Sequence, residues 1–348
     1  MSDYNGLQRL LHYAALANTS ILEATLDAEL GFCKSKLKDH SLQKHVFVSG
    51  LARGGTTILM RSLYETSQFA SLTYADMPFV LAPNLWSKIS GTSRKQPQLK
   101  ERAHGDGILV DVNSPEALDE VFWRTVAGRQ YLHNEYLVPH DCDDEIIDKY
   151  RRYVAAILMH YKKDRYLSKN NNNILRLGCI FRALPNATIL IPFRDPVQHA
   201  QSLLCQHALF KKKQSEDTFV RRYMSWLGHY EFGLAHKPLM VKDGLTRYSD
   251  PGRINYWLQQ WYNVYVFLLA EIDNYPSNTI CVSYELFCSD TETIWQSLCN
   301  ILEINDSPSP EMREKVRDVA PGSDEELLTD VQNIYKKLTD RCRNALLA

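Results

Sequence analysis

A glycine-rich loop with one arginine is the part of this chain whose residue types and spacing are best suited to chemistry. It lies within residues 45–63, which read HVFVSGLARGGTTILMRSL. Gly50 and Gly55 have the spacing of the two glycines in a phosphate-binding loop, and Thr57 stands at the position of that loop's Ser or Thr hydroxyl. Thr56, however, stands at the position where such loops usually carry a lysine. Because Arg53 is the only cation in the loop, a triphosphate with its metal would lack its main counter-charge. The loop therefore favours a less charged group carried on a single phosphate.

A second candidate anion site follows a run of residues that is apolar on both faces. Residues 188–193, TILIPF, predict an interior strand of a parallel sheet, and Arg194-Asp-Pro comes directly after them. Ser202 stands about two turns into the helix expected next. Because the carboxyl ends of parallel strands meet at one edge of a sheet, we expect Arg194 near the glycine-rich loop. Two anion sites without magnesium ligands favour a ligand with two separated phosphate groups.

The elements around these residues predict a three-layer α/β fold with a central parallel sheet and a P-loop-like nucleotide-binding core. A β-branched run at 46–48 predicts the strand before the loop, and the apolar spacing from Ile58 to Leu63 predicts the helix after it. Backbone N–H groups of the loop then converge at the positive end of a helix. A second short strand is expected at 71–74, with Asp76 at its end. Further helices are expected at 6–31 with a break near residue 18, and at 116–124, 144–168, 174–184, 219–232, 253–272 and 325–347.

Composition limits the class of protein. The 348 residues carry a net charge of −1 and are 45% apolar, which allows a large core and argues against nucleic acid as a partner. The first residues do not resemble a signal peptide and no run is long enough to span a membrane, so we expect a cytoplasmic protein. Eight cysteines without a C-x-x-C pair predict reduced thiols. The group His140-Asp-Cys-Asp-Asp contains metal-ligating side chains, but its place before a helix favours a solvated turn.

The two anion motifs resemble those of one family. The run Gly50-Leu-Ala-Arg-Gly-Gly-Thr-Thr is similar to the 5′-phosphosulfate loop of the sulfotransferases that depend on 3′-phosphoadenosine-5′-phosphosulfate (PAPS). Arg194-Asp-Pro with Ser202 is similar to the 3′-phosphate motif of that family, and residues 280–286 resemble its late strand. The resemblance spans residues 46–304 and is closer to the carbohydrate, tyrosylprotein and bacterial branches than to the cytosolic small-molecule branch.

The resemblance implies a role for each matching residue. Arg53 occupies the position of the family's catalytic Lys or Arg, and would stabilise charge on the bridging oxygen as the sulfuryl group leaves. Arg194 and Ser202 would bind the 3′-phosphate. The residues that would hold the 5′-phosphosulfate or lie near the nucleotide are Gly54, Gly55, Thr56, Thr57 and Tyr284. The donor would be PAPS, the product would be adenosine 3′,5′-bisphosphate, and no metal is expected.

The chain also departs from the family pattern. Gly54 stands where Ser is usual, residues 319–325 are not the basic glycine-rich motif of the cytosolic branch, and that branch's catalytic His is missing. The acceptor hydroxyl must still lose its proton to a nearby group. Tyrosylprotein-like relatives use a carboxylate shortly after the loop helix, for which Asp76 is the nearest equivalent. His104 is the second candidate base and Glu120 the third.

We therefore expect one domain over residues 1–348, with a helical prelude at 1–40, an acceptor cap drawn from 76–150 and a peripheral helix at 323–348. The expected reaction is transfer of a sulfuryl group from PAPS to the hydroxyl of a carbohydrate or small-molecule alcohol, or to an amine. Within the same fold, the alternative is an NTP-dependent kinase-like transferase. Outside enzymes, the alternative is a nucleotide-binding regulator without catalysis. No motif in the cap identifies the acceptor.

Overall fold

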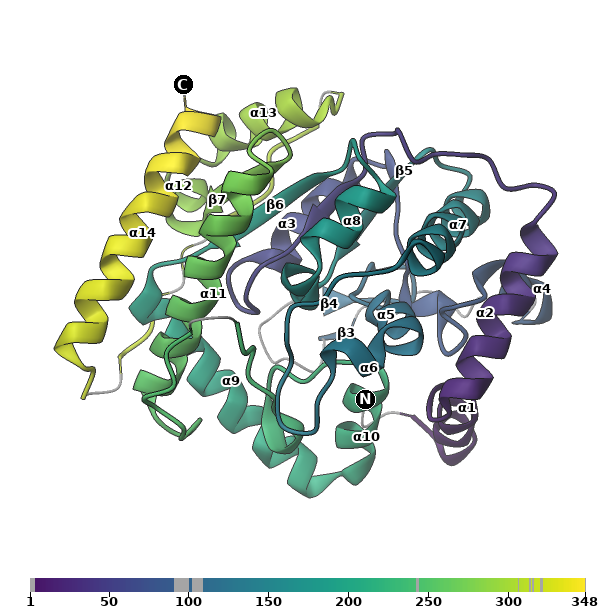
Figure 1. The fold of residues 1–348 in the computed structure, drawn as a ribbon, viewed down its shortest axis with the longest axis horizontal. Helices are drawn as coiled ribbons and strands as arrows, with labels where there is room; N and C mark the ends of the chain where they lie inside the picture. Colours follow the sequence, from purple (N-terminus) through teal and green to yellow (C-terminus); the bar gives the residue numbers. More distant parts are fainter. Residues whose placement is uncertain are drawn as a thin grey trace.

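Five parallel strands form the centre of the fold, in the order β2, β5, β1, β6, β7 (Figure 1). In this computed structural model the described residues are 4–90, 100–101, 109–241, 244–305, 307–312, 314, 316–319 and 322–347. The strands of the sheet are β1 (Val46–Val48), β2 (Phe69–Ala70), β5 (Arg165–Lys169), β6 (Thr188–Phe193) and β7 (Thr279–Ser283). A separate antiparallel pair consists of β3 (Lys100–Glu101) and β4 (Leu109–Val110). The predicted α/β architecture with a central parallel sheet is confirmed.

Helices cover both sides of the sheet. In Figure 1, α8 and α11 lie in front of the strands and α3 lies behind them. The helices are α1 (Gly6–Leu16), α2 (Thr19–Cys33), α3 (Thr56–Glu65), α4 (Pro83–Ser90), α5 (Glu120–Val126), α6 (Gly128–Tyr131), α7 (Asp144–Tyr161), α8 (Leu177–Ala183), α9 (Pro196–Glu216), α10 (Thr218–Trp226), α11 (Ile254–Asn274), α12 (Tyr284–Ser289), α13 (Thr291–Leu302) and α14 (Glu325–Leu346). Short 3-10 turns are η1 (Tyr74–Asp76), η2 (Asn171–Leu175) and η3 (Gly233–Ala235). At one end of the molecule α14 packs on β7 and α11, and at the other α2 packs on α4 and α7 (Figure 1).

The strand register brings three strand ends to one place. Val48, the last residue of β1, pairs with Lys169 of β5 on one side and with Leu190 of β6 on the other. Beyond the strand, Asn170 N donates to Val48 O at 3.2 Å, and Ser49 N donates to Leu190 O at 2.9 Å. The chain that leaves β1 therefore enters the glycine-rich loop between β5 and β6, at the edge of the sheet where ligands bind in such folds.

Several predicted elements match the structure closely. Strand β6 has the predicted bounds, β7 lies at the predicted late strand, and α14 covers nearly all of residues 325–347. The N-terminal helical pattern breaks where expected, because the side chain of Asn18 accepts a hydrogen bond from Ser20 N at 2.8 Å and caps α2. Strong apolar periodicity and a capping residue were both visible in these segments.

Two predicted helices are too long. The helix predicted over 144–168 ends at Tyr161, and the residues after it form β5, which is buried beside β1. Lys162 ends α7 by adopting φ 54, a left-handed cap that a sequence pattern does not reveal. The helix predicted over 219–232 ends at Trp226, since Gly228 turns the chain with φ 75.

The segment after the loop helix also differs from the prediction. The strand expected at 71–74 lies earlier, as β2, and Asp76 sits in the turn η1 rather than at a strand end. Thr73 and Asp76 form a reciprocal capping box that satisfies the backbone and stabilises the turn. The helix expected over 116–124 begins only at Glu120. Ser114 has a side chain that could cap a helix starting near residue 116, but its Oγ instead accepts a hydrogen bond from Asp111 N at 3.0 Å in a preceding turn.

One hydrophobic cluster extends through the chain, from Ala15 in α1 to Leu346 in α14. It includes both faces of the central strands, which explains why β1 and β6 read as continuous apolar runs. No helix in the described ranges combines the length and the apolar character that crossing a bilayer requires.

Candidate active site

The glycine-rich loop turns sharply into α3. Gly55 has φ 93 and Arg53 has φ 73, so both lie in the left-handed region that glycine adopts most easily. A Cβ on Gly55 would lie 3.1 Å from Cδ2 of Tyr284, and a Cβ on Gly54 would lie 3.1 Å from Cε1 of His199. These two positions leave almost no room for a side chain. Because α3 begins directly after Gly55, its first backbone N–H groups lie at the loop.

The second anion motif lies beside this loop. Arg194 follows β6 and is only 5% exposed, and Ser202 on α9 is also buried. Nε of Arg53 lies 3.4 Å from Oγ of Ser202, in a long hydrogen bond that joins the loop to α9. The guanidinium of Arg194 lies 4.9 Å from the centre of the Tyr284 ring and its Nε lies 4.0 Å from Oε1 of Glu285. The structure therefore brings the predicted donor residues after β1, β6 and β7 to the same edge of the sheet.

The ring of His199 on α9 forms a hydrogen bond to the backbone of the loop, a contact that the sequence did not predict. Its Nε2 lies 2.8 Å from the carbonyl oxygen of Ala52, and because a carbonyl only accepts, this nitrogen carries the hydrogen. Burial lowers the pKa of His199 to about 3, so the ring is neutral at pH 7. His199 lies in the helix expected after Arg194, but nothing in its spacing indicated that the ring would reach the loop.

Asp76, the first predicted base, is buried in its own hydrogen-bond network. Its Oδ2 accepts hydrogen bonds from Thr73 N at 2.8 Å and from the Tyr161 hydroxyl at 2.6 Å. Its Oδ1 lies 3.7 Å from Nε2 of His160. Burial raises the pKa of this carboxyl above its usual range. His104, the second predicted base, lies outside the described residues.

Glu120, the third predicted base, forms a fully buried ion pair with Arg176. Oε2 of Glu120 lies 2.9 Å from Nη1 of Arg176 and accepts a hydrogen bond from Asn170 Nδ2 at 2.7 Å. Its Oε1 accepts from Arg176 Nη2 at 3.1 Å and from the hydroxyl of Tyr131. The guanidinium also lies between two rings, 4.6 Å from the centre of Tyr131 and 4.9 Å from that of Trp123. A carboxylate with both oxygens engaged in this way favours a structural role.

A small cavity opens beside the first half of the loop. It has a volume of about 40 Å³, and its wall includes loop residues 50–52, Leu203, Asn171 and Glu231. Sequence reasoning missed the last two residues. Asn171 follows β5, a strand that the sequence pattern assigned to a helix, so its place at a carboxyl strand end was hidden. No motif marks Glu231, which lies in the last part of the helix predicted over 219–232 and in the structure follows α10 outside any helix.

Comparison with known sequences decides the family. A model of the sulfotransferase family matches residues 45–243. The chain belongs to the sulfotransferase family. The matched region contains the glycine-rich loop, Arg194, Ser202 and Glu231, whereas Tyr284 and Glu285 lie beyond it.

Solved structures similar to this sulfotransferase come from bacteria. The sulfotransferase STF1 from Mycobacterium tuberculosis H37Rv is 12% identical, with a TM-score of 0.48 over 94% of this chain and 83% of that one. STF9 from Mycobacterium avium is 12% identical, with a TM-score of 0.49 over 96% and 78%. A sulfotransferase from Alicyclobacillus acidocaldarius is 12% identical, with a TM-score of 0.42 over 87% and 96%. No curated protein sequence matches this sulfotransferase.

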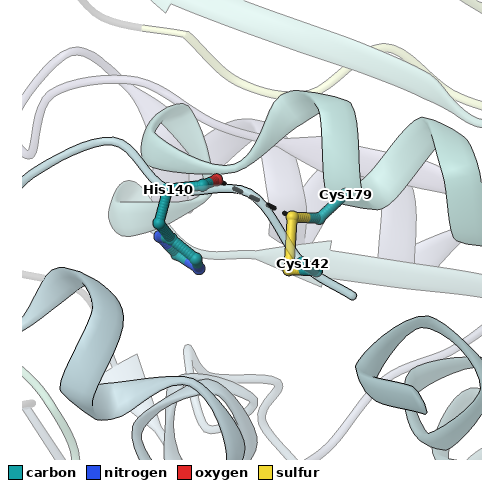
Figure 2. Close-up of side chains that lie close together, drawn as sticks. All are labelled: His140, Cys142 and Cys179. Atoms are coloured by element: carbon teal, nitrogen blue, oxygen red, sulfur yellow. Dashed lines mark hydrogen bonds between the residues drawn. A yellow bond between two sulfur atoms is a disulfide. The ribbon is translucent and has the colours of Figure 1, made fainter. Parts of the chain in front are cut away.

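Three residues of metal-ligating types, His140, Cys142 and Cys179, lie close together, as Figure 2 shows. Their ligand atoms lie within 4.8 Å of one another. The two sulfur atoms are joined in a disulfide, so the prediction of reduced thiols is wrong for this pair (Figure 2). The partners are 37 residues apart, and only the packing of α8 beside the start of α7 brings them together. Because a disulfide sulfur is not a thiolate, the oxidised pair leaves His140 as the only usual metal ligand of this cluster.

Proposed function

We propose that this sulfotransferase uses PAPS as its donor and transfers the sulfuryl group to an acceptor hydroxyl or amine, with adenosine 3′,5′-bisphosphate as product. The observation that carries this proposal is the contact between Arg53 and Ser202, whose Nε and Oγ atoms are 3.4 Å apart. It joins the loop after β1 to the helix after β6. Two adjoining anion sites of this kind suit one ligand that carries phosphate at both its 5′ and its 3′ position.

Each donor residue has a proposed task. Gly54, Gly55, Thr56 and Thr57 would hold the 5′-phosphosulfate through backbone N–H and hydroxyl groups, in a loop too tight for larger side chains. Arg53 would stabilise the charge that grows on the bridging oxygen.

The other end of the donor would meet Arg194, Ser202 and Tyr284. Arg194 is a buried cation at a strand end, which favours an anionic ligand such as the 3′-phosphate. Tyr284, whose ring lies against Gly55 and the Arg194 guanidinium, would border the nucleotide.

The remaining expectations stay proposals. Asp76 and His104 are the bases proposed from the sequence, and residues 76–150 are proposed to form the acceptor cap of a single domain. A cytoplasmic location also stays a proposal, and the Cys142–Cys179 disulfide weighs against a strongly reducing compartment.

Calorimetry with two nucleotides tests the donor. We expect adenosine 3′,5′-bisphosphate to bind without magnesium, and ATP with magnesium to bind much more weakly, because the loop has Thr56 in place of lysine. Arg194→Ala should weaken binding of the bisphosphate by about 10- to 100-fold, the usual effect of losing a charge-assisted hydrogen bond. Arg53→Ala should lower turnover by about 10²- to 10³-fold with a smaller effect on binding. Arg253→Ala is the matched control, since this side chain is 82% exposed.

Three outcomes would contradict the proposal. Tight binding of magnesium ATP in place of the bisphosphate would indicate a kinase-like transferase. Binding of the bisphosphate without sulfation of any hydroxyl or amine would indicate a nucleotide-binding regulator. Full turnover by Arg53→Ala would remove this arginine from the chemistry.

A further inference from the structure

The small cavity beside the loop adjoins both anion motifs. Its wall includes loop residues 50–52, and Arg53 follows them directly. Its wall also includes Leu203, the residue after Ser202 on α9. The cavity thus borders the loop and α9, the two elements that the contact between Arg53 and Ser202 joins. A group bound in the cavity is therefore next to the groups proposed to hold the donor.

Three ionisable side chains line the cavity: Glu231, His236 and Lys237. Both ring nitrogens of His236 already form hydrogen bonds within the protein. Nδ1 of His236 lies 3.1 Å from the carbonyl oxygen of Tyr230, so it must donate. Nε2 of His236 is then the acceptor for the Tyr256 hydroxyl at 2.6 Å. Burial lowers the pKa of His236 to about 4. Its lone pair is therefore not available to take a proton from an acceptor.

Lys237 is equally unsuited to act as a base. Its Nζ donates to the carbonyl oxygens of His133, at 2.8 Å, and of Asn134. An ammonium held by two carbonyl oxygens keeps its proton and has no lone pair to offer. Among the ionisable lining residues, Glu231 is therefore the one whose side chain can accept a proton.

The Glu231 carboxylate has one oxygen engaged and one available. Its Oε1 accepts a hydrogen bond from Nδ2 of Asn171 at 2.8 Å, and Oε2 has no hydrogen-bond partner among the described residues. Asn171 is only 8% exposed, and its Oδ1 is buried and likewise has no partner in the described part of the chain. Because Oδ1 has almost no accessible surface, the contribution of Asn171 is its amide donor, which holds Oε1 of Glu231. Asn171 and Glu231 thus place a held carboxylate on a cavity wall whose other polar side chains are Asn172, His236, Lys237 and Gln260.

We infer that Glu231, oriented by Asn171, is the general base of the transfer, and that the cavity binds the hydroxyl end of an apolar alcohol. This inference rests on the proposed function. The acceptor oxygen forms a bond to the donor sulfur while the bond from sulfur to the 5′-phosphate oxygen breaks. The electron pair of the broken bond stays on that phosphate oxygen, beside Arg53, and the hydroxyl proton passes to Oε2 of Glu231. Glu231 is favoured over Asp76 because Glu231 lies on the wall of the cavity beside the loop and Asp76 does not.

The rest of the cavity wall indicates the class of acceptor. The apolar side chains that line it are Leu51, Leu137, Leu203, Pro238, Leu239 and Trp257. The other polar side chains on the wall, Asn172, His236, Lys237 and Gln260, already hydrogen-bond to protein groups. A sugar would therefore bury several further hydroxyls with few partners, which costs free energy for each one. The volume of about 40 Å³ has room for about three water-sized groups. The cavity therefore suits the narrow end of a linear primary alcohol.

The test uses the full-length protein, labelled PAPS and two acceptors, 1-hexanol and methyl β-galactoside. We expect the wild-type enzyme to sulfate 1-hexanol with a kcat/KM at least tenfold higher than for the sugar. Glu231→Gln should lower kcat by about 10²- to 10⁴-fold, the range for loss of a general base, with a smaller effect on the KM for 1-hexanol. Asn171→Leu should lower kcat with a smaller effect on the KM for 1-hexanol, since it removes the hydrogen bond that orients the carboxylate but leaves the apolar wall in place. Leu239→Trp should raise the KM for 1-hexanol at least tenfold by filling the cavity.

Two controls separate this inference from the proposed function. Affinity for adenosine 3′,5′-bisphosphate should stay within about twofold of wild type in all three variants, which also reports that they fold. Glu216→Gln, at a glutamate that is 62% exposed on α9, should leave every measurement unchanged. Turnover by Glu231→Gln at more than half the wild-type rate, or failure of the wild-type enzyme to sulfate 1-hexanol, overturns the inference alone. Failure of the wild-type enzyme to bind the bisphosphate refutes the proposed function, and this inference with it.

Discussion

The buried ion pair between Glu120 and Arg176 allows a sharp test of whether Glu120 is structural. Both side chains are fully buried, and the Arg176 guanidinium is enclosed between two aromatic rings. Glu120→Gln keeps the shape of the side chain and an acceptor for Asn170 Nδ2, but it removes the negative charge. Arg176 then loses its ion-pair partner in a site without water to solvate it, and the weaker attraction of the buried Asp119 carboxylate remains.

The expected loss of stability is large. Removing one partner of a buried pair costs about 3–5 kcal/mol in proteins, and the total stability of a folded domain is about 5–15 kcal/mol. Urea denaturation, followed by tryptophan fluorescence, measures this loss as a lower midpoint at unchanged slope. Glu216→Gln removes a carboxylate from an exposed pair with Lys212 and should leave the midpoint unchanged.

Turnover, measured below the unfolding transition, distinguishes the structural role from a catalytic one. We expect the folded fraction of the Glu120→Gln variant to retain turnover within about tenfold of the wild-type enzyme, because the general base lies elsewhere. A variant with wild-type stability and a loss of turnover of more than about 10²-fold would show that Glu120 is the base and that its ion pair contributes little.

Three further predictions concern the loop, the histidines and the disulfide. Gly55→Ala should weaken binding of adenosine 3′,5′-bisphosphate at least tenfold in calorimetry, because φ is 93 and the new Cβ meets Tyr284 at 3.1 Å. Gly31→Ala, in α2 with nothing within 4 Å, should instead stabilise the protein by about 0.5–1 kcal/mol. Burial lowers the pKa of His45 to about 4 and those of His140 and His199 to about 3, against 6.5 for ordinary histidine. The unfolded chain therefore binds more protons below pH 6.5, so the free energy of unfolding in urea should fall between pH 6.5 and pH 4; a constant value would contradict the assignment. Reducing the Cys142–Cys179 disulfide with dithiothreitol should lower the free energy of unfolding by about 3–4 kcal/mol, and the Cys142→Ser, Cys179→Ser double variant should not respond.

The donor half of the candidate site was predictable because it is local in sequence. A glycine loop between a strand and a helix constrains its own shape, and Arg194 follows a strand whose apolar run was unmistakable. The parallel register then placed both motifs at one edge, as the general rule for such sheets expects.

The acceptor half was not predictable in the same way. Strand β5 is short and polar at its ends, and it follows a helix without a break in pattern, so the place of Asn171 at a strand end was hidden. Asp76 was expected at the end of a strand, and the capping box with Thr73 instead holds it in a turn. Glu231 lies 60 residues from Asn171, and no periodicity connects the two.

The amino-acid sequence alone determined the fold class, the loop, and the pair of residues proposed for the 3′-phosphate, since each depends on short-range spacing and on the parallel sheet. Tertiary packing determined which carboxylates are engaged and which one faces the cavity. Burial and hydrogen bonding between distant segments set the charge and availability of a carboxylate. Glu120 is neutralised by Arg176, whereas Glu231 retains an oxygen directed to no protein partner among the described residues.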